Sequence, residues 1–197
     1  VDALARSAEG GSTILVTAVE PAGVERLSRL IGQPVRLSGC ECFQAAKAGD
    51  DLLVSGISHD DLCWVVYDEW GSEFRNEDNR RWAIASHAIA SPIEGGRVLL
   101  TSAEVILNGQ WYGDGIVQRP PTYQFTDGGQ PLMVSVIRGR GRIVLCQLNL
   151  HDPAQATEIP LPGHRLWEQD RYDPRRVRTR ILATLLANLG ADLKGAE

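Results

Sequence analysis

The amino-acid sequence predicts a single three-layer α/β domain, residues 1–197, with a mainly parallel sheet and an antiparallel hairpin toward its C-terminal end. A length of 197 residues is enough for one domain with a sizeable core. The chain opens on a helix–strand–helix pattern, the alternation that covers a sheet with helices. It closes on two apolar segments joined by a glycine-rich turn and followed by a long amphipathic helix.

The N-terminal elements are predicted from the spacing of the apolar residues and from the glycines and prolines at the expected ends. Asp2–Glu9 is expected to form a helix that ends at Gly10 and Gly11. The segment 12–19 (STILVTAV) is a short apolar run rich in β-branched residues, typical of strands buried on both faces in parallel sheets. Pro21 opens the next helix at its first turn. The apolar positions of that helix keep helical spacing at Val24, Leu27, Leu30 and Ile31.

The middle of the chain gives weaker signals. Segments 52–54 and 62–67 are apolar and favour strands, 82–90 alternates weakly, and 98–100 begins a short strand. The charged segment 69–81 is predicted to be an exposed loop. The segment 108–114 (NGQWYGD) is rich in turn-forming residues.

The hairpin near the C-terminus has the clearest signal. Segments 132–137 and 142–150 are apolar and are joined by the sequence Arg-Gly-Arg-Gly at 138–141. The glycines supply turn conformations that residues with a Cβ resist. The sequence therefore predicts two antiparallel strands here.

A helix is predicted to follow, with Asp173 as its cap, Pro174 in its first turn and Gly190 at its end. Its apolar stripe repeats every four residues at Val177, Ile181, Leu185 and Leu189. Four arginines lie near its start, at Arg175, Arg176, Arg178 and Arg180. The helix dipole disfavours positive charge there, so we expect an acidic residue such as Asp170 or Asp173 to compensate.

The net charge and the lengths of the apolar runs argue against some classes of function. The formal net charge is −5, which argues against nucleic acid as a partner. No apolar run approaches the ~20 residues that a membrane helix needs. The first ten residues lack a signal-peptide pattern, do not begin with Met and look like a helix already in progress. We therefore expect a fragment of a longer multidomain protein, whose compartment the sequence does not indicate.

The four cysteines and four histidines are the candidates for catalytic or metal-binding groups. Cys40 and Cys42 are one residue apart, unlike the spacing of zinc or thioredoxin motifs, and Cys146 lies in an apolar strand. A hydrolase would pair Cys40 or Cys42 with a histidine, but 38–42 (SGCEC) lacks the elbow that exposes a nucleophile. The candidate histidines are His59, His87, His151 and His164. We favour structural cysteines, with no metal and no cofactor.

Two short polar clusters, His59-Asp60-Asp61 and His151-Asp152, follow apolar segments. Strand ends of this kind are where α/β sheets bind ligands. An Asp after a His in a turn more often caps local backbone groups, and we favour that interpretation.

Aromatic and polar residues of the turn-rich segment are the candidates for sugar contact. Aromatic faces stack on sugar rings, and clustered exposed aromatics mark binding sites. The candidate binding residues are Trp111, Tyr112, Asp114 and Asn108. A glycosidase would need two carboxylates, and Asp68, Glu69 and Asp114 are the candidates near these aromatics.

The closing pattern resembles the end of the amidotransferase-like (flavodoxin-like) domains of bacterial glycoside hydrolases related to family 2 and the β-galactosidases. It comprises the turn Gly139-x-Gly141-Arg142, the strand 143–150 and the helix 180–190 (RILATLLANLG). The opening helix, glycine pair and strand, and the loop 56–62 followed by Trp64, are similar to the same domains. The resemblance implies a flavodoxin-like fold.

This sequence departs from class I glutamine amidotransferases, which carry a cysteine elbow and a His-x-Glu pair. Neither motif occurs here, so no catalytic residue is carried over. In a glycosidase parent, the catalytic carboxylates are expected in another domain.

The resemblance implies a non-catalytic accessory or interdomain module of a carbohydrate-active glycoside hydrolase. The expected partners are other domains of the same polypeptide, with carbohydrate and a second copy of the chain as further candidates. Two alternatives stay open. One is a divergent Cys/His hydrolase of amidotransferase-like fold, and the other is a small-ligand or sugar-binding module.

Overall fold

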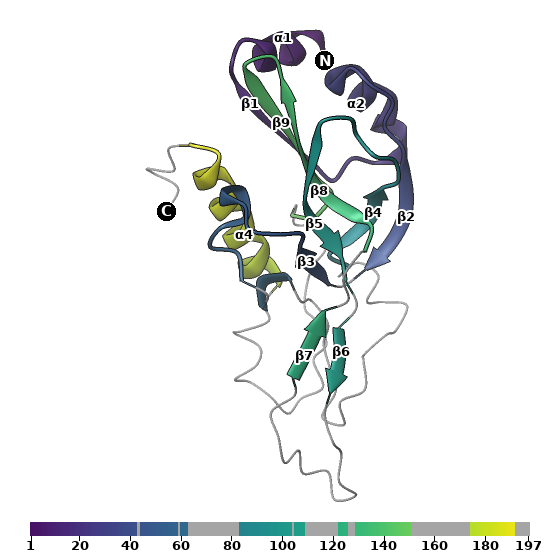
Figure 1. The fold of residues 1–197 in the computed structure, drawn as a ribbon, viewed down its shortest axis with the longest axis vertical. Helices are drawn as coiled ribbons and strands as arrows, with labels where there is room; N and C mark the ends of the chain where they lie inside the picture. The colour runs from purple at the N-terminus through teal and green to yellow at the C-terminus, as the bar shows by residue number, and fades with distance from the viewer. Residues whose placement is uncertain are drawn as a thin grey trace, which may run out of the picture.

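The computed structural model describes residues 1–42, 44–58, 60–62, 83–103, 105–108, 122–125, 129–150 and 174–191 (Figure 1). The helices are α1 (Asp2–Glu9), α2 (Val24–Ile31) and α4 (Pro174–Asn188), with 3₁₀ turns η1 (Pro21–Gly23), η2 (Leu52–Val54) and η3 (Asp60–Leu62). The strands are β1 (Thr13–Thr17), β2 (Leu37–Cys42), β3 (Ala45–Lys47), β4 (Ala85–Ile89), β5 (Gly96–Ser102), β6 (Val105–Asn108), β7 (Thr122–Phe125), β8 (Pro131–Arg138) and β9 (Gly141–Cys146). The α/β class predicted from the sequence is confirmed.

The main sheet is mixed. Its five strands have the order β1-β9-β8-β5-β3, and β1 runs parallel to β9 while the other three pairs are antiparallel. Over the described residues, the expected mainly parallel sheet is therefore corrected to a mixed one. The apolar run of β1 has another cause: Leu15 packs against one hydrophobic cluster and Ile14 and Val16 pack against a second, all three partly buried. Helices on both faces of a sheet favour such a run whatever the direction of the neighbouring strands. Two further antiparallel pairs, β2–β4 and β6–β7, form separate two-stranded sheets.

Alternate residues of β9 enter two separate hydrophobic clusters. Ile143 and Leu145 pack with residues of α1 and α2, whereas Val144 and Cys146 pack with residues of α4 and η2. Because successive side chains of a strand point to opposite faces, α1 and α2 lie on one face of the sheet and α4 on the other. We call these the α1/α2 side and the α4 side.

The predicted hairpin is confirmed as β8 and β9, joined at Gly139 with a φ of 59°. Gly141 lies directly against the backbone oxygens of Ala8 and Ser12, so no side chain fits there. The second strand ends at Cys146 rather than at residue 150. The glycines thus serve close packing on the end of α1 as well as the turn.

The other expected elements have mixed outcomes. The helices at the N-terminus and the C-terminal helix are confirmed, with Gly32 ending α2 at a φ of 85°. Leu52–Val54 is a 3₁₀ turn instead of a strand, because the Asp51 carboxylate caps it by accepting from the Leu53 N–H at 2.8 Å. Asn108 ends strand β6 instead of belonging to a turn. Apart from Leu62 in η3, the expected strand 62–67 lies outside the described residues, as do the loop 69–81 and residues 109–114.

Across the described ranges, none of the helices combines the length and the apolar character needed to span a membrane.

Candidate functional site

The predicted sugar-contact residues are not tested by the structure. Trp111, Tyr112 and Asp114 lie outside the described residues, and Asn108 is described only as the last backbone position of β6. The carboxylates Asp68 and Glu69 lie outside them as well. The polar groups within the described residues are therefore the candidates for a functional site.

The carboxyl end of the parallel pair β1–β9 is where α/β sheets commonly bind ligands. Here the side-chain amide of Gln147, which follows β9, bonds the backbone just after β1. Its Oε1 accepts from the Val19 N–H at 2.8 Å and its Nε2 donates to the Val19 carbonyl at 3.2 Å. Gln147 is only 4% exposed. The amide thus continues the pairing of β1 with β9 beyond Cys146.

The backbone at this point is unusual. Ala18 has a φ of 46°, and it is the one non-glycine position with a positive φ among the described residues. Its N–H donates to the carbonyl of Cys146 at 2.8 Å. A side chain in the left-handed region costs about 1–2 kcal/mol, so the surrounding bonds must hold Ala18 there.

A histidine and a carboxylate lie beside the same strand end. The Nδ1 of His87, on β4, is 3.9 Å from the Oε2 of Glu20, whose side chain is 73% exposed. Of the four candidate histidines, only His87 belongs to the described residues. It pairs with Gly39 in the β2–β4 ladder, one position before Cys40.

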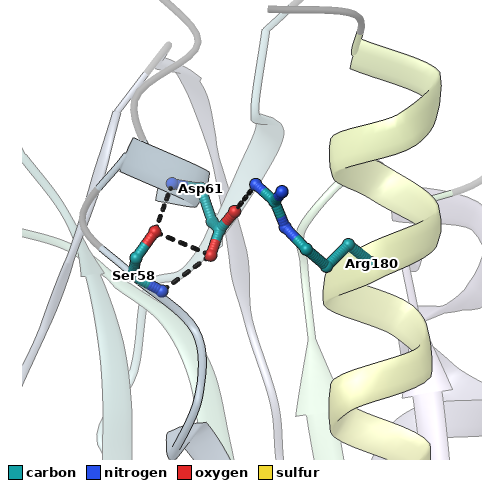
Figure 2. A network of polar contacts seen from close by, with 3 residues as sticks. All are labelled: Ser58, Asp61 and Arg180. Atoms are coloured by element: carbon teal, nitrogen blue, oxygen red, sulfur yellow. Dashed lines mark hydrogen bonds and ion pairs between the residues drawn. The ribbon is translucent and has the colours of Figure 1, made fainter. Parts of the chain in front are cut away.

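A second polar cluster joins η3 to α4 (Figure 2). The Asp61 carboxylate accepts from the Ser58 N–H at 2.7 Å and from the Ser58 hydroxyl at 2.8 Å. The Asp61 N–H donates back to the Ser58 hydroxyl at 3.2 Å. The other carboxylate oxygen accepts from the guanidinium of Arg180. The Ser58-x-x-Asp61 arrangement is a reciprocal cap, which confirms the turn interpretation of Asp61.

The Asp61 side chain is 4% exposed, and burial by itself opposes its ionisation. The Ser58 N–H, the Ser58 hydroxyl and the Arg180 guanidinium outweigh burial and hold the pKa of Asp61 below its usual value. Asp61 therefore provides a counter-charge for Arg180. The compensating residues predicted from the sequence, Asp170 and Asp173, lie outside the described residues.

The third cluster is the pair of thiols on β2. Cys40 and Cys42 are both partly exposed, and both pack against the core on the α4 side. The hydrogen bond from the Cys42 thiol lowers the pKa of Cys40 to about 7 against partial burial, with help from the Ser102 hydroxyl. The hydrogen bond to Cys40 and burial raise the pKa of Cys42. Cys146 is buried, as predicted, and burial raises its pKa to about 12.

Within the described ranges, no group of three His, Cys, Asp or Glu side chains is placed to hold a metal ion. The described part thus offers a mixed α/β fold with three polar clusters. No protein-family model, curated protein or solved structure matches the chain.

Proposed function

We propose that this domain is a non-catalytic accessory module of a carbohydrate-active glycoside hydrolase and packs against other domains of the same polypeptide. The proposal includes a three-layer, flavodoxin-like arrangement. Helices on both faces of the main sheet support that arrangement, because β9 sends alternate side chains to α1 and α2 and to α4. The mixed strand directions set it apart from a fully parallel sheet.

The observation that carries the proposal is the pair of hydrogen bonds between the buried Gln147 amide and Val19 at the carboxyl end of β1 and β9. An enzyme of α/β fold uses this end to present polar groups to a ligand. In this chain both polar atoms of the nearest buried amide are engaged by the backbone of Val19. These bonds support a structural role for the amide at the end of the sheet where an enzyme would bind its ligand.

The other described polar groups support the same conclusion. The Asp61 carboxylate accepts from Ser58 and from Arg180, and the Asn188 amide donates to the carbonyls of Leu53 and Ser55 at 3.1 and 2.8 Å. The contacts of Arg180 and Asn188 fasten α4 to the segment that contains η2 and η3. This is the pattern of a scaffold whose polar side chains hold the fold together.

The test uses the full-length product of the gene that encodes this chain, and residues 1–197 alone, on a panel of chromogenic aryl glycosides. We expect the full-length product to hydrolyse at least one glycoside and residues 1–197 to hydrolyse none. Cross-linking followed by mass spectrometry should join residues 1–197 to a catalytic domain of the same chain. A gene product that consists of these residues alone, or turnover by the isolated chain, would overturn the proposal.

The same preparations separate the two alternatives. Ester or amide hydrolysis by residues 1–197 that disappears in Cys40→Ser would favour the Cys/His hydrolase. Sugar binding that is lost in Trp111→Ala and Tyr112→Ala would favour a sugar-binding module. Trp167→Ala is the matched control, because it removes an aromatic residue outside the candidate set.

A further inference from the structure

The thiols of Cys40 and Cys42 lie at an irregular point of β2. The β2–β4 ladder shifts register between Gly39 and Cys42, so β2 has one residue more than β4 over this stretch. Such a bulge bends the strand and increases its twist. Both cysteines pack against the same core cluster, and their side chains share a hydrogen bond.

The two thiols differ in protonation, which gives each a distinct chemical role. The Cys40 sulfur accepts hydrogen bonds from Cys42 and Ser102, so its thiolate is stabilised near neutral pH. Cys42 keeps its proton and lies beside it. This is the arrangement of an attacking thiolate with a resolving thiol as its neighbour.

We propose that Cys40 and Cys42 form a thiol–disulfide exchange site that reacts with small disulfides, such as oxidised glutathione, and closes to a reversible disulfide within β2. The Cys40 thiolate attacks one sulfur of the small disulfide, forming a mixed disulfide and releasing one thiolate. Cys42 then loses its proton and attacks the Cys40 sulfur, and the second small thiolate leaves. The protein dithiol is oxidised, and the small disulfide is reduced to two thiols.

The distance that the backbone can span between the Cα atoms of Cys40 and Cys42 permits a disulfide and makes it easy to reduce. Two residues of extended chain span at most about 7 Å between Cα atoms, near the upper end of the ~4.4–6.8 Å seen in disulfides. A bulge bends the chain away from full extension. Disulfides closed at the edge of the allowed geometry are readily reduced, as expected of an exchange site rather than a structural crosslink. This inference is independent of the proposed accessory role.

The experiment treats the reduced chain with oxidised glutathione at neutral pH, then caps remaining thiols and maps tryptic peptides by mass spectrometry. Cleavage after Arg36 and Lys47 yields one peptide that contains Cys40 and Cys42 and neither of the other cysteines. We expect this peptide to become resistant to capping, with an internal disulfide that a small dithiol removes quickly. Cys146 serves as the internal control, since it is fully buried and should stay reduced.

Two variants assign the steps. In Cys42→Ser the reaction should stop at a mixed disulfide on Cys40, whereas in Cys40→Ser the glutathione adduct on this peptide should form several-fold more slowly. Circular dichroism of both variants serves as the control that they are folded. The proposal is overturned if the peptide stays reduced, if it bonds to Cys63 instead, or if wild-type protein accumulates glutathione on both cysteines without closing the internal bond.

Discussion

The two sides of the main sheet hold their helices by different chemistry. On the α1/α2 side, Arg138 of the hairpin donates to the carbonyl of Ile31 at 2.8 Å and pairs with the Glu9 carboxylate at 2.9 Å. On the α4 side, Arg180 pairs with the carboxylate of Asp61, and Asn188 donates to the carbonyls of Leu53 in η2 and of Ser55 just after it. The first attachment adds close backbone packing by Gly141, and the second adds a buried carboxylate.

The two sides of the sheet should differ in how their stability responds to pH and to substitution. Backbone contacts at Gly141 depend on shape, and their strength does not change with pH. The attachment at Asp61 requires an ionised group, and the thiols of Cys40 and Cys42 with shifted pKa values pack on the same side. Substitutions should therefore act sterically on the α1/α2 side and electrostatically on the α4 side.

The largest expected effect is that of Gly141→Ala on the α1/α2 side. An added Cβ would overlap the backbone oxygens of Ala8 and Ser12, so α1 and the hairpin must move apart. Overpacking costs about 1–3 kcal/mol, and a clash with backbone belongs at the upper end. Urea denaturation should show a loss of about 3 kcal/mol that is the same at acid and neutral pH.

Gly39→Ala is the matched control for that substitution. Gly39 lies in β2, nothing lies within 4 Å of a Cβ added there, and its φ is not in the left-handed region. We expect its stability to stay within about 0.5 kcal/mol of the wild type. If both variants lose equal stability, the close packing of Gly141 is not what holds α1.

Asp61→Asn probes the attachment of α4. The pKa of Asp61 is lowered in the folded protein, so the carboxylate contributes stability that is fully present above its unfolded pKa of about 4. That contribution is lost as the pH falls through the folded pKa. We expect Asp61→Asn to cost about 1–3 kcal/mol at neutral pH, and the difference from the wild type to shrink as the pH falls through the folded pKa of Asp61.

The measurement is urea denaturation of both proteins from neutral to acid pH. Glu9→Gln is the control on the opposite side, because Glu9 is 48% exposed where it pairs with Arg138. Exposed pairs contribute about 0–1 kcal/mol, so this control should change little. A constant difference between Asp61→Asn and the wild type at all pH values would contradict the electrostatic account.

The same contrast explains which parts of the fold could be predicted. The hairpin and α4 are local patterns: a glycine turn between two apolar segments, and apolar residues repeating every four positions. Strand β2 was not predicted, because 38–42 contains a glycine and two small thiols with no clear alternation. Its pairing is decided by β4, far along the chain. The antiparallel pairing of β5 with β8 and of β3 with β5 was equally beyond a local pattern.

The polar clusters were predictable to different degrees. Ser58-x-x-Asp61 has the spacing of a capping box, so the sequence supported the turn interpretation. That Asp61 pairs with Arg180 needs the fold, because the partners are 119 positions apart. The tie from Gln147 to Val19 spans 128 positions. Its only signal was an amide at the end of an apolar segment, where a buried polar group needs a partner.

A smaller effect is expected from Ala18→Gly just after the carboxyl end of β1. Glycine adopts a positive φ without the penalty that alanine incurs, although it loses more conformational entropy on folding. We expect thermal and urea unfolding to show a gain of about 0.5 kcal/mol. Ala90→Gly is the control: Ala90 is exposed without a positive φ, so this variant should lose about 0.5–1 kcal/mol. Equal losses in the two variants would mean that Ala18 is not strained.

The smallest effect on the fold is expected from Cys42→Ala, which isolates the chemistry of the α4 side. The thiol of Cys42 is the main cause of the lowered pKa of Cys40, and the Ser102 hydroxyl is a weaker one. Removing Cys42 should move the midpoint of Cys40 alkylation from about pH 7 upward toward the ordinary cysteine value of about 8.5. Ser102→Ala should move it in the same direction by less. Iodoacetamide labelling across a pH series, read on the peptide between Arg36 and Lys47, measures both shifts. A midpoint unchanged by Cys42→Ala would show that the neighbouring thiol does not stabilise the thiolate, and the exchange site would lose its attacking group.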